Sequence, residues 1–165
     1  MRKTALCLIL PVLALLLSAC SDGRKVETPV ACHATPERWL TALAEAPDQV
    51  LLENVTPISA CLPADQSAAK QEEVGLTALE VANNLSGTIK ASGGVAAGKN
   101  PNADRAALMA GYLVGAIEKG AGETDGIHDT LVTRIEAAAT NGLDQAGQAI
   151  QGEFQVGYEA GRRDG

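Results

Sequence analysis

His128 and the acids around it are the residues of this chain best suited to acid–base or metal chemistry. Asp129 follows the histidine directly, and Glu123 and Asp125 lie a few residues before it. A carboxylate beside an imidazole is an arrangement that general-base catalysis and metal binding both use. One histidine with acids nearby also occurs often by chance, so we expect a surface histidine beside a helix cap. Because the chain has no H-E-x-x-H or G-x-S-x-G motif, we predict no catalytic residue and no bound metal.

The segment at 92–102 reads SGGVAAGKNPN and contains the G-x-x-x-x-G-K spacing of a phosphate-binding loop. In such a loop a strand precedes the glycines, a helix opens at the lysine, and the next residue is a serine or threonine that binds magnesium. Here Asn100 and Pro101 follow the lysine, and a helical pattern precedes the glycines. We therefore predict a turn at this point and no nucleotide or other cofactor.

The start of the chain carries an export signal. Arg2 and Lys3 precede an apolar run over 4–17, and the run ends in Leu-Ser-Ala-Cys at 17–20. A basic segment, an apolar segment and a small-residue cleavage site are the parts of a secretory signal peptide. The last four residues resemble the lipobox of bacterial lipoprotein precursors. The resemblance implies cleavage before Cys20, acylation of its sulfur, and anchoring in the cell membrane or outer membrane, with the mature chain facing outside the cytoplasm.

The rest of the chain has the size of one domain. Residues 1–19 are interpreted as the signal peptide, 20–34 as a polar lipidated tether and 35–165 as the domain. The signal removes two of the 13 basic residues and none of the 20 acids, leaving a formal charge of 11 − 20 = −9. That charge argues against nucleic acid as a partner. No later segment offers roughly 18 uninterrupted apolar residues, so the lipid is the expected attachment to the bilayer.

Two cysteines remain for structural chemistry, because Cys7 leaves with the signal and Cys20 takes the lipid. In an oxidising compartment, Cys32 and Cys61 are expected to form a disulfide. Closing a loop of about 30 residues stabilises a fold by roughly 3–4 kcal/mol in the chain-entropy model. A metal site built on these two cysteines and His33 is the alternative, but it lacks a C-x-x-C pair and a clear fourth ligand.

Two copies of the pattern G-Y-x-x-G lie at 111–115 and 157–161. In each copy two glycines lie one helical turn apart on the same face, with a tyrosine beside them: Gly111, Tyr112 and Gly115, then Gly157, Tyr158 and Gly161. Glycine lowers helix stability by up to about 1 kcal/mol relative to alanine, so such pairs indicate close backbone approach. We predict that the two helices cross here within one chain. A seam between two copies, or a ligand slot between the helices, is the alternative.

Hydrophobic periodicity predicts helices throughout the domain, and the abundance of alanine and glycine predicts a thin, tightly packed core. We expect five helical segments: one from Thr35 to Pro47, one over 65–91, one over 103–119, one capped by Thr124 or Asp125 and ending at Asn141, and one carrying Leu143 to Gly161. Within the fourth, Ile127, Leu131, Ile135 and Ala138 are expected to face the core. The apolar segment 50–63 is interpreted as an ordered crossing loop, since a strand there has no obvious partner. The predicted fold is an all-α single small helical bundle.

These patterns predict a class of protein rather than an activity. We expect a lipid-anchored, non-catalytic helical domain of the bacterial envelope that acts structurally or through an envelope protein partner. The expected partner surface is a hydrophobic patch on the glycine seam. The alternative is a carrier of a small molecule or metal with a pocket between helices, to which Tyr112, Tyr158 and His128 would supply polar groups.

Overall fold

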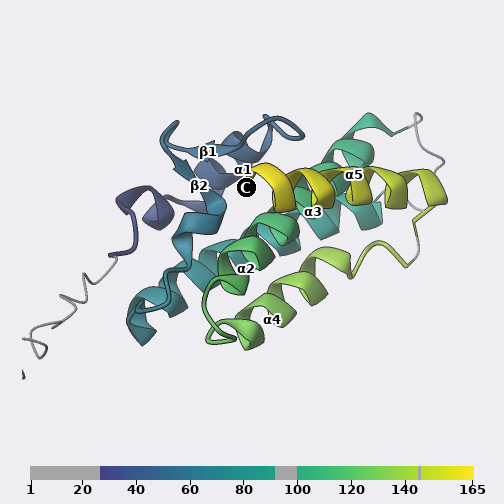
Figure 1. Ribbon diagram of the computed structural model, residues 1–165. Coiled ribbons are helices and arrows are strands. Elements are labelled where there is room, and N and C mark those ends of the chain that lie inside the picture. Colours follow the sequence, from purple (N-terminus) through teal and green to yellow (C-terminus); the bar gives the residue numbers. More distant parts are fainter. Residues whose placement is uncertain (1–26, 92–99, 145) are drawn as a thin grey trace, which may run out of the picture.

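Five helices make up most of the computed structural model, which describes residues 27–91, 100–144 and 146–165 (Figure 1). They are α1 (Pro36–Leu43), α2 (Ala68–Ala91), α3 (Pro101–Gly122), α4 (Asp129–Thr140) and α5 (Gln148–Asp164). The 3-10 turns η1 (Val30–His33) and η2 (Ile58–Cys61) and the strands β1 (Leu51–Leu52) and β2 (Thr56–Pro57) complete the described elements. The predicted all-α bundle is confirmed, with one small antiparallel hairpin added. Among the described helices, none combines the length and the apolar character needed to cross a membrane.

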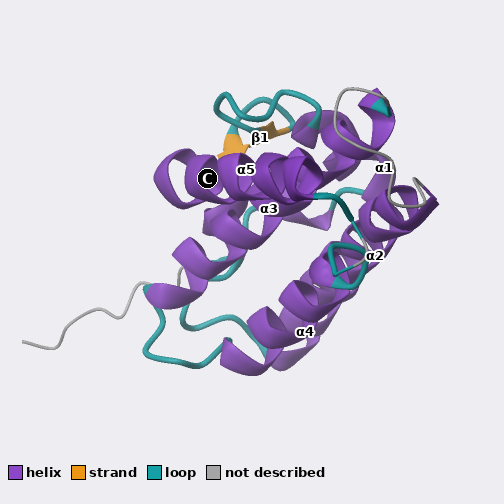
Figure 2. Ribbon diagram, turned by 90° about the vertical axis from the view of Figure 1, so that its right-hand side faces the viewer, coloured by secondary structure: helices purple, strands orange, loops and turns teal. Residues whose placement is uncertain are grey.

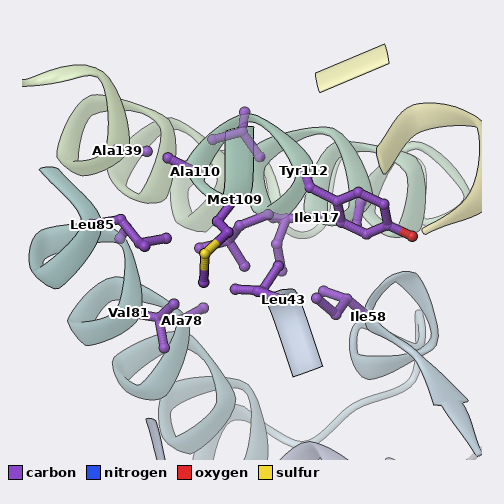
Figure 3. Close-up of a cluster of buried hydrophobic side chains, with 14 of the residues drawn as sticks. Leu43, Ile58, Ala78, Val81, Leu85, Met109, Ala110, Tyr112, Ile117 and Ala139 are labelled. Carbon is purple, nitrogen blue, oxygen red and sulfur yellow. The ribbon is translucent and has the colours of Figure 1, made fainter. Parts of the chain in front are cut away.

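Helix α3 forms the centre of the bundle, as its uncharged stretch over 106–117 predicts: every residue of that stretch is buried. Figure 2 shows two helix pairs, α3 beside α5 and α2 beside α4. In the core, side chains from α2, α3, α1 and η2 point toward one another (Figure 3). Most of these side chains are small or aliphatic, which allows the helix backbones to lie close together.

Helix α2 matches its predicted apolar stripe. The stripe residues are all buried: Val74, Ala78, Val81, Ala82, Leu85 and Ile89. The helix begins at Ala68, three residues later than predicted, because residues 63–67 form a turn in which the Gln66 N–H binds the Pro63 carbonyl.

Helix α1 begins at Pro36, as predicted, but ends at Leu43, before Pro47. The residues that follow form a turn whose carbonyls, at Ala44 and Ala46, accept hydrogen bonds from the Arg105 guanidinium of α3. A contact with a distant helix therefore ends α1 earlier than the local pattern indicates.

The segment 50–63 contains the hairpin that the sequence prediction missed. Leu51 pairs with Pro57 and Leu52 with Thr56, so the segment supplies its own partner strand. Glu53 and Asn54 make the turn with φ values of 52° and 61°. Two successive positive φ values are typical of hairpin turns that match the twist of the strands, although neither residue is a glycine.

Helix α3 begins two residues earlier than predicted, because Asn100 caps it. The Asn100 side chain accepts a hydrogen bond from the Ala103 N–H at 3.3 Å, and Pro101 occupies the first turn. An asparagine followed by proline is a favourable start for a helix. The segment 92–99, with the glycines of the phosphate-loop spacing, lies outside the described residues.

Helix α4 begins at Asp129, so the predicted caps Thr124 and Asp125 are wrong. The Thr124 hydroxyl instead donates to the Ala121 carbonyl of α3, and Asp125 adopts a φ of 51° in a turn. As a consequence Ile127 precedes the helix and is 58% exposed rather than buried.

Toward the end of the chain two further details differ from the prediction. Ala139, rather than Ala138, is the fully buried alanine of α4. Helix α4 ends at Thr140 with Asn141 as its C-cap, as predicted, but α5 begins only at Gln148. Leu143 and Ala146, which the prediction placed in the last helix, lie in the connection before it.

Candidate functional site

The disulfide joins the first described turn to the middle of the fold. Cys32 of η1 and Cys61 of η2 are bonded, with a Cα–Cα distance of 5.4 Å, and both are fully buried. The same end of the chain is held by Gln66, whose amide donates to the Thr28 hydroxyl at 2.8 Å and to the Cys61 carbonyl at 3.0 Å. Residues 28–34 therefore pack against the bundle, and the free tether is shorter than 20–34.

A metal site on Cys32, His33 and Cys61 is ruled out by these bonds. Both sulfurs are committed to each other, and His33 Nδ1 lies 3.0 Å from a carboxylate oxygen of Glu73 on α2. Across the described ranges, no three His, Cys, Asp or Glu side chains are arranged to hold a metal ion.

The four seam glycines bring the backbones of α3 and α5 into contact within the chain. A Cβ added at Gly111 or Gly157 would lie 1.9 Å from a backbone oxygen of the facing helix, and one at Gly115 or Gly161 would lie 2.2 Å from one. Contacts below 3.0 Å are essentially never made by real Cβ atoms. The crossing is reciprocal, since each helix supplies two glycines to the other. It leaves no room at these four positions for a ligand or a second copy, so a partner would have to contact other residues of the two helices.

The two tyrosines beside the glycines have separate partners. Tyr112 is fully buried, and its hydroxyl accepts a hydrogen bond from the Val50 N–H at 3.0 Å. Burial raises the pKa of the Tyr112 phenol. Tyr158 is half-buried and donates to a carboxylate oxygen of Glu118 at 2.5 Å. That hydrogen bond is the main reason that the pKa of Tyr158 is raised. Both tyrosines therefore fasten α3 or α5 to a neighbouring segment.

Glu118 is a site residue that the sequence prediction missed. The carboxylate oxygen that binds Tyr158 also lies 3.3 Å from Arg162 Nη1, so one acid on α3 holds two residues of α5. Glu118, Glu136 and Phe154 are among the residues that line a hollow of about 190 Å³ beside this contact. Because 40 residues separate Glu118 from Tyr158, no local motif could have indicated the pair.

His128 is buried, with 1% of its surface exposed, so the predicted surface position is wrong. Its Nδ1 lies 2.7 Å from the Gln71 amide nitrogen on α2, and its Nε2 lies 3.2 Å from the Pro63 carbonyl oxygen. A neutral imidazole protonated on Nε2 satisfies both bonds, accepting from Gln71 and donating to Pro63. With both ring nitrogens engaged, His128 fixes the start of α4 to the segment before α2.

The acids that surround His128 in the sequence do not join it. Glu123, Asp125 and Asp129 are all exposed, whereas the imidazole points into the bundle. These acids therefore do not form the carboxylate–imidazole arrangement that a general base would need.

Four of the surface hollows, each lined by described residues, have volumes of about 190–470 Å³. The largest of these four lies beside the first described turn, and one of about 340 Å³ lies between α2 and α4. Neither Tyr112 nor His128 lines any of these four, and Tyr158 lines one of them. The polar groups that the carrier alternative requires therefore do not converge on one of these hollows.

Comparison with known proteins adds no relative to this description. No protein-family model, no curated protein and no solved structure matches the chain. A functional assignment therefore depends on the residues and contacts described above.

Proposed function

We propose that this chain is a lipoprotein of the bacterial envelope, in which a lipid on Cys20 holds a non-catalytic helical domain at a membrane surface outside the cytoplasm. The observation that carries the proposal is the Leu-Ser-Ala-Cys at 17–20, placed after Arg2, Lys3 and an apolar run. These parts occur in the order that export and lipid attachment require.

The disulfide supports an exported location. Disulfides persist in oxidising compartments and are rare in the cytoplasm. The Cys32–Cys61 bond closes a segment with a sequence separation of 29 residues and lies fully inside the fold. Its contribution of roughly 3–4 kcal/mol in the chain-entropy model is a large part of the stability of a small domain. A protein that uses such a bond is suited to the outside of the cytoplasm.

The contacts of the ionisable and phenolic side chains support a structural or binding role over catalysis. His128, Tyr112 and Tyr158 each bind a partner that joins two elements of the bundle. In the proposed mechanism, the lipid confines this rigid body to two dimensions and raises its effective concentration near other envelope proteins. Because the seam is closed, a protein partner would contact the outer faces of the helices.

Labelling with an isotopic fatty acid in a bacterial host tests the proposal. The full chain is expected to take up the label and to lose 19 of its 165 residues, so that the mature protein begins at Cys20. Cys20→Ser should abolish both label and cleavage. Cys7→Ser is the matched control, because Cys7 lies within the signal and its loss should change neither. An unlabelled, full-length protein in the cytoplasmic fraction would overturn the proposal.

A further inference from the structure

One end of the bundle combines exposed apolar side chains with the entry point of the chain. We call this end the anchor pole and define it by Pro29, Val30, Ala60, Pro63 and Ala64. Val30 is 88% exposed, the largest exposed fraction among the large hydrophobic residues of the described chain. The other four line the hollow of about 470 Å³. A single exposed valine is ordinary on a protein surface, so its exposure alone does not indicate a binding surface. What points to one is the position of the pole relative to the tether.

The length of the tether places the anchor pole next to the bilayer. Seven residue steps separate Cys20 from Glu27, the first described residue, and a fully extended chain of that length spans at most about 25 Å. Helix α2 starts near this pole, where Gln66 binds Thr28, and its 24 residues extend for about 36 Å. The far end of α2 therefore lies beyond the reach of a tether that leaves from the pole. In Figure 1 the first described turn and the N-terminus of α5 lie at opposite ends of the molecule.

The point on the bundle from which the tether leaves is fixed by the fold. The hydrogen bond from Gln66 to Thr28 holds the chain to the bundle two residues before Val30. The Cys32–Cys61 bond holds it two residues after Val30. The tether therefore starts from an immobilised point rather than from a free terminus. A lipid pulling on this point turns the same end of the bundle toward the membrane in every molecule.

The charges around the anchor pole indicate which kind of lipid surface it fits. Among the described residues on or beside it, Glu27, Asp65 and Glu123 are exposed acids, and no lysine or arginine lines the hollow. The tether adds Asp22, Arg24 and Lys25, so the acids named here number four and the bases two. Acidic side chains are repelled by anionic lipid headgroups, whereas a zwitterionic surface carries no such net charge. The pole therefore fits a zwitterionic phospholipid surface.

From these observations we infer that the anchor pole is the membrane-facing surface of the protein, with Val30 in contact with zwitterionic phospholipid. The inference rests on the proposed lipid anchor and adds the orientation of the domain. It places the C-terminal end of α2 and the N-terminus of α5 farthest from the bilayer, where a protein partner can reach them.

Tryptophan quenching in vesicles of brominated phosphatidylcholine tests the orientation with the full-length lipidated protein. Val30→Trp places a fluorophore on the anchor pole, and Val156→Trp is the matched control on the exposed face of α5. The native Trp39 is fully buried and is measured as background in the unsubstituted protein. Brominated lipid is expected to quench most of the emission added at position 30 and little of that added at 156. Ala64→Trp should behave like Val30→Trp, which guards against a folding defect in one variant.

Flotation of the vesicles distinguishes a failure of the lipid anchor from a failure of the membrane-facing assignment. Protein that does not float with the vesicles would overturn the lipid anchor itself. Protein that floats while Val30→Trp and Ala64→Trp stay unquenched would overturn the membrane-facing assignment and leave the anchor intact. Equal quenching at positions 30 and 156 would also overturn it, because the domain would then have no preferred orientation.

Discussion

Gly111→Ala is expected to lower the free energy of unfolding by about 2–4 kcal/mol, because the crossing of α3 and α5 cannot accept the new methyl group. Its Cβ would lie 1.9 Å from the Phe154 carbonyl oxygen, against a practical minimum of 3.0 Å. One helix must therefore shift by about 1 Å, and a gap of that size removes about a quarter to a half of the dispersion energy of each contact that it opens. The higher helix propensity of alanine returns at most about 1 kcal/mol, which does not offset this loss.

Urea unfolding of the oxidised protein, followed by circular dichroism at several protein concentrations, measures the change. Gly152→Ala is the control, since it adds the same methyl group to α5 at a position with no atom within 4 Å. It is expected to stabilise the protein by up to about 1 kcal/mol. Equal unfolding midpoints for the two variants would refute the close crossing. A loss that depends on protein concentration would show that the glycines meet between chains.

Three further predictions concern the other contacts of the bundle. Replacing Cys32 and Cys61 together with alanine is expected to lower the free energy of unfolding by roughly 3–4 kcal/mol, measured in urea, after which a reducing agent should have no further effect. His128→Ala leaves two partly buried partners unpaired and is expected to cost about 2–4 kcal/mol, whereas His33→Ala, which removes a contact with the exposed Glu73 carboxylate, should cost about 1 kcal/mol or less. The pKa of Tyr158 is raised in the folded state. Its contribution to stability is therefore complete below the unfolded pKa of about 10 and is lost as the pH rises through the folded pKa. Tyr158→Phe should show a shallower loss of stability in unfolding measurements above about pH 10, and an unchanged slope would contradict this account.

The parts of the fold that the sequence predicted correctly depend on local patterns. The stripe of α2 repeats every three to four residues, and the uncharged stretch of α3 marks the helix that the others cover. The spacing of the seam glycines is also local, since each pair must lie on one helix face. Gly120 makes an equally close approach, because a Cβ there would lie 2.2 Å from the Ser59 carbonyl oxygen. A single glycine carries no repeat, so this contact could not be anticipated.

The parts that were missed depend on contacts between distant segments or on turns without glycine. In the hairpin, the chain reverses direction at Glu53 and Asn54, two residues that together give no strong turn signal in the sequence. The start of α4 was misplaced because Thr124 binds a carbonyl in a turn, although threonine is also a favoured helix cap. The burial of His128 is set by partners 57 and 65 residues earlier in the chain. No window of sequence around the histidine contains that information.

The disulfide between η1 and η2 also determines how the molecule bears a mechanical load. Tension applied through a lipid at Cys20 meets the hydrogen bond between Thr28 and Gln66 first, and is then carried by the covalent bond from Cys32 to Cys61, beside the packed interior. Helix α1 and the hairpin lie in the covalent loop behind that bond, so they carry almost none of the force. A force applied at the bilayer would therefore move the folded domain as a unit. In a chain whose disulfide is reduced, the same force would unfold the domain from its first turn.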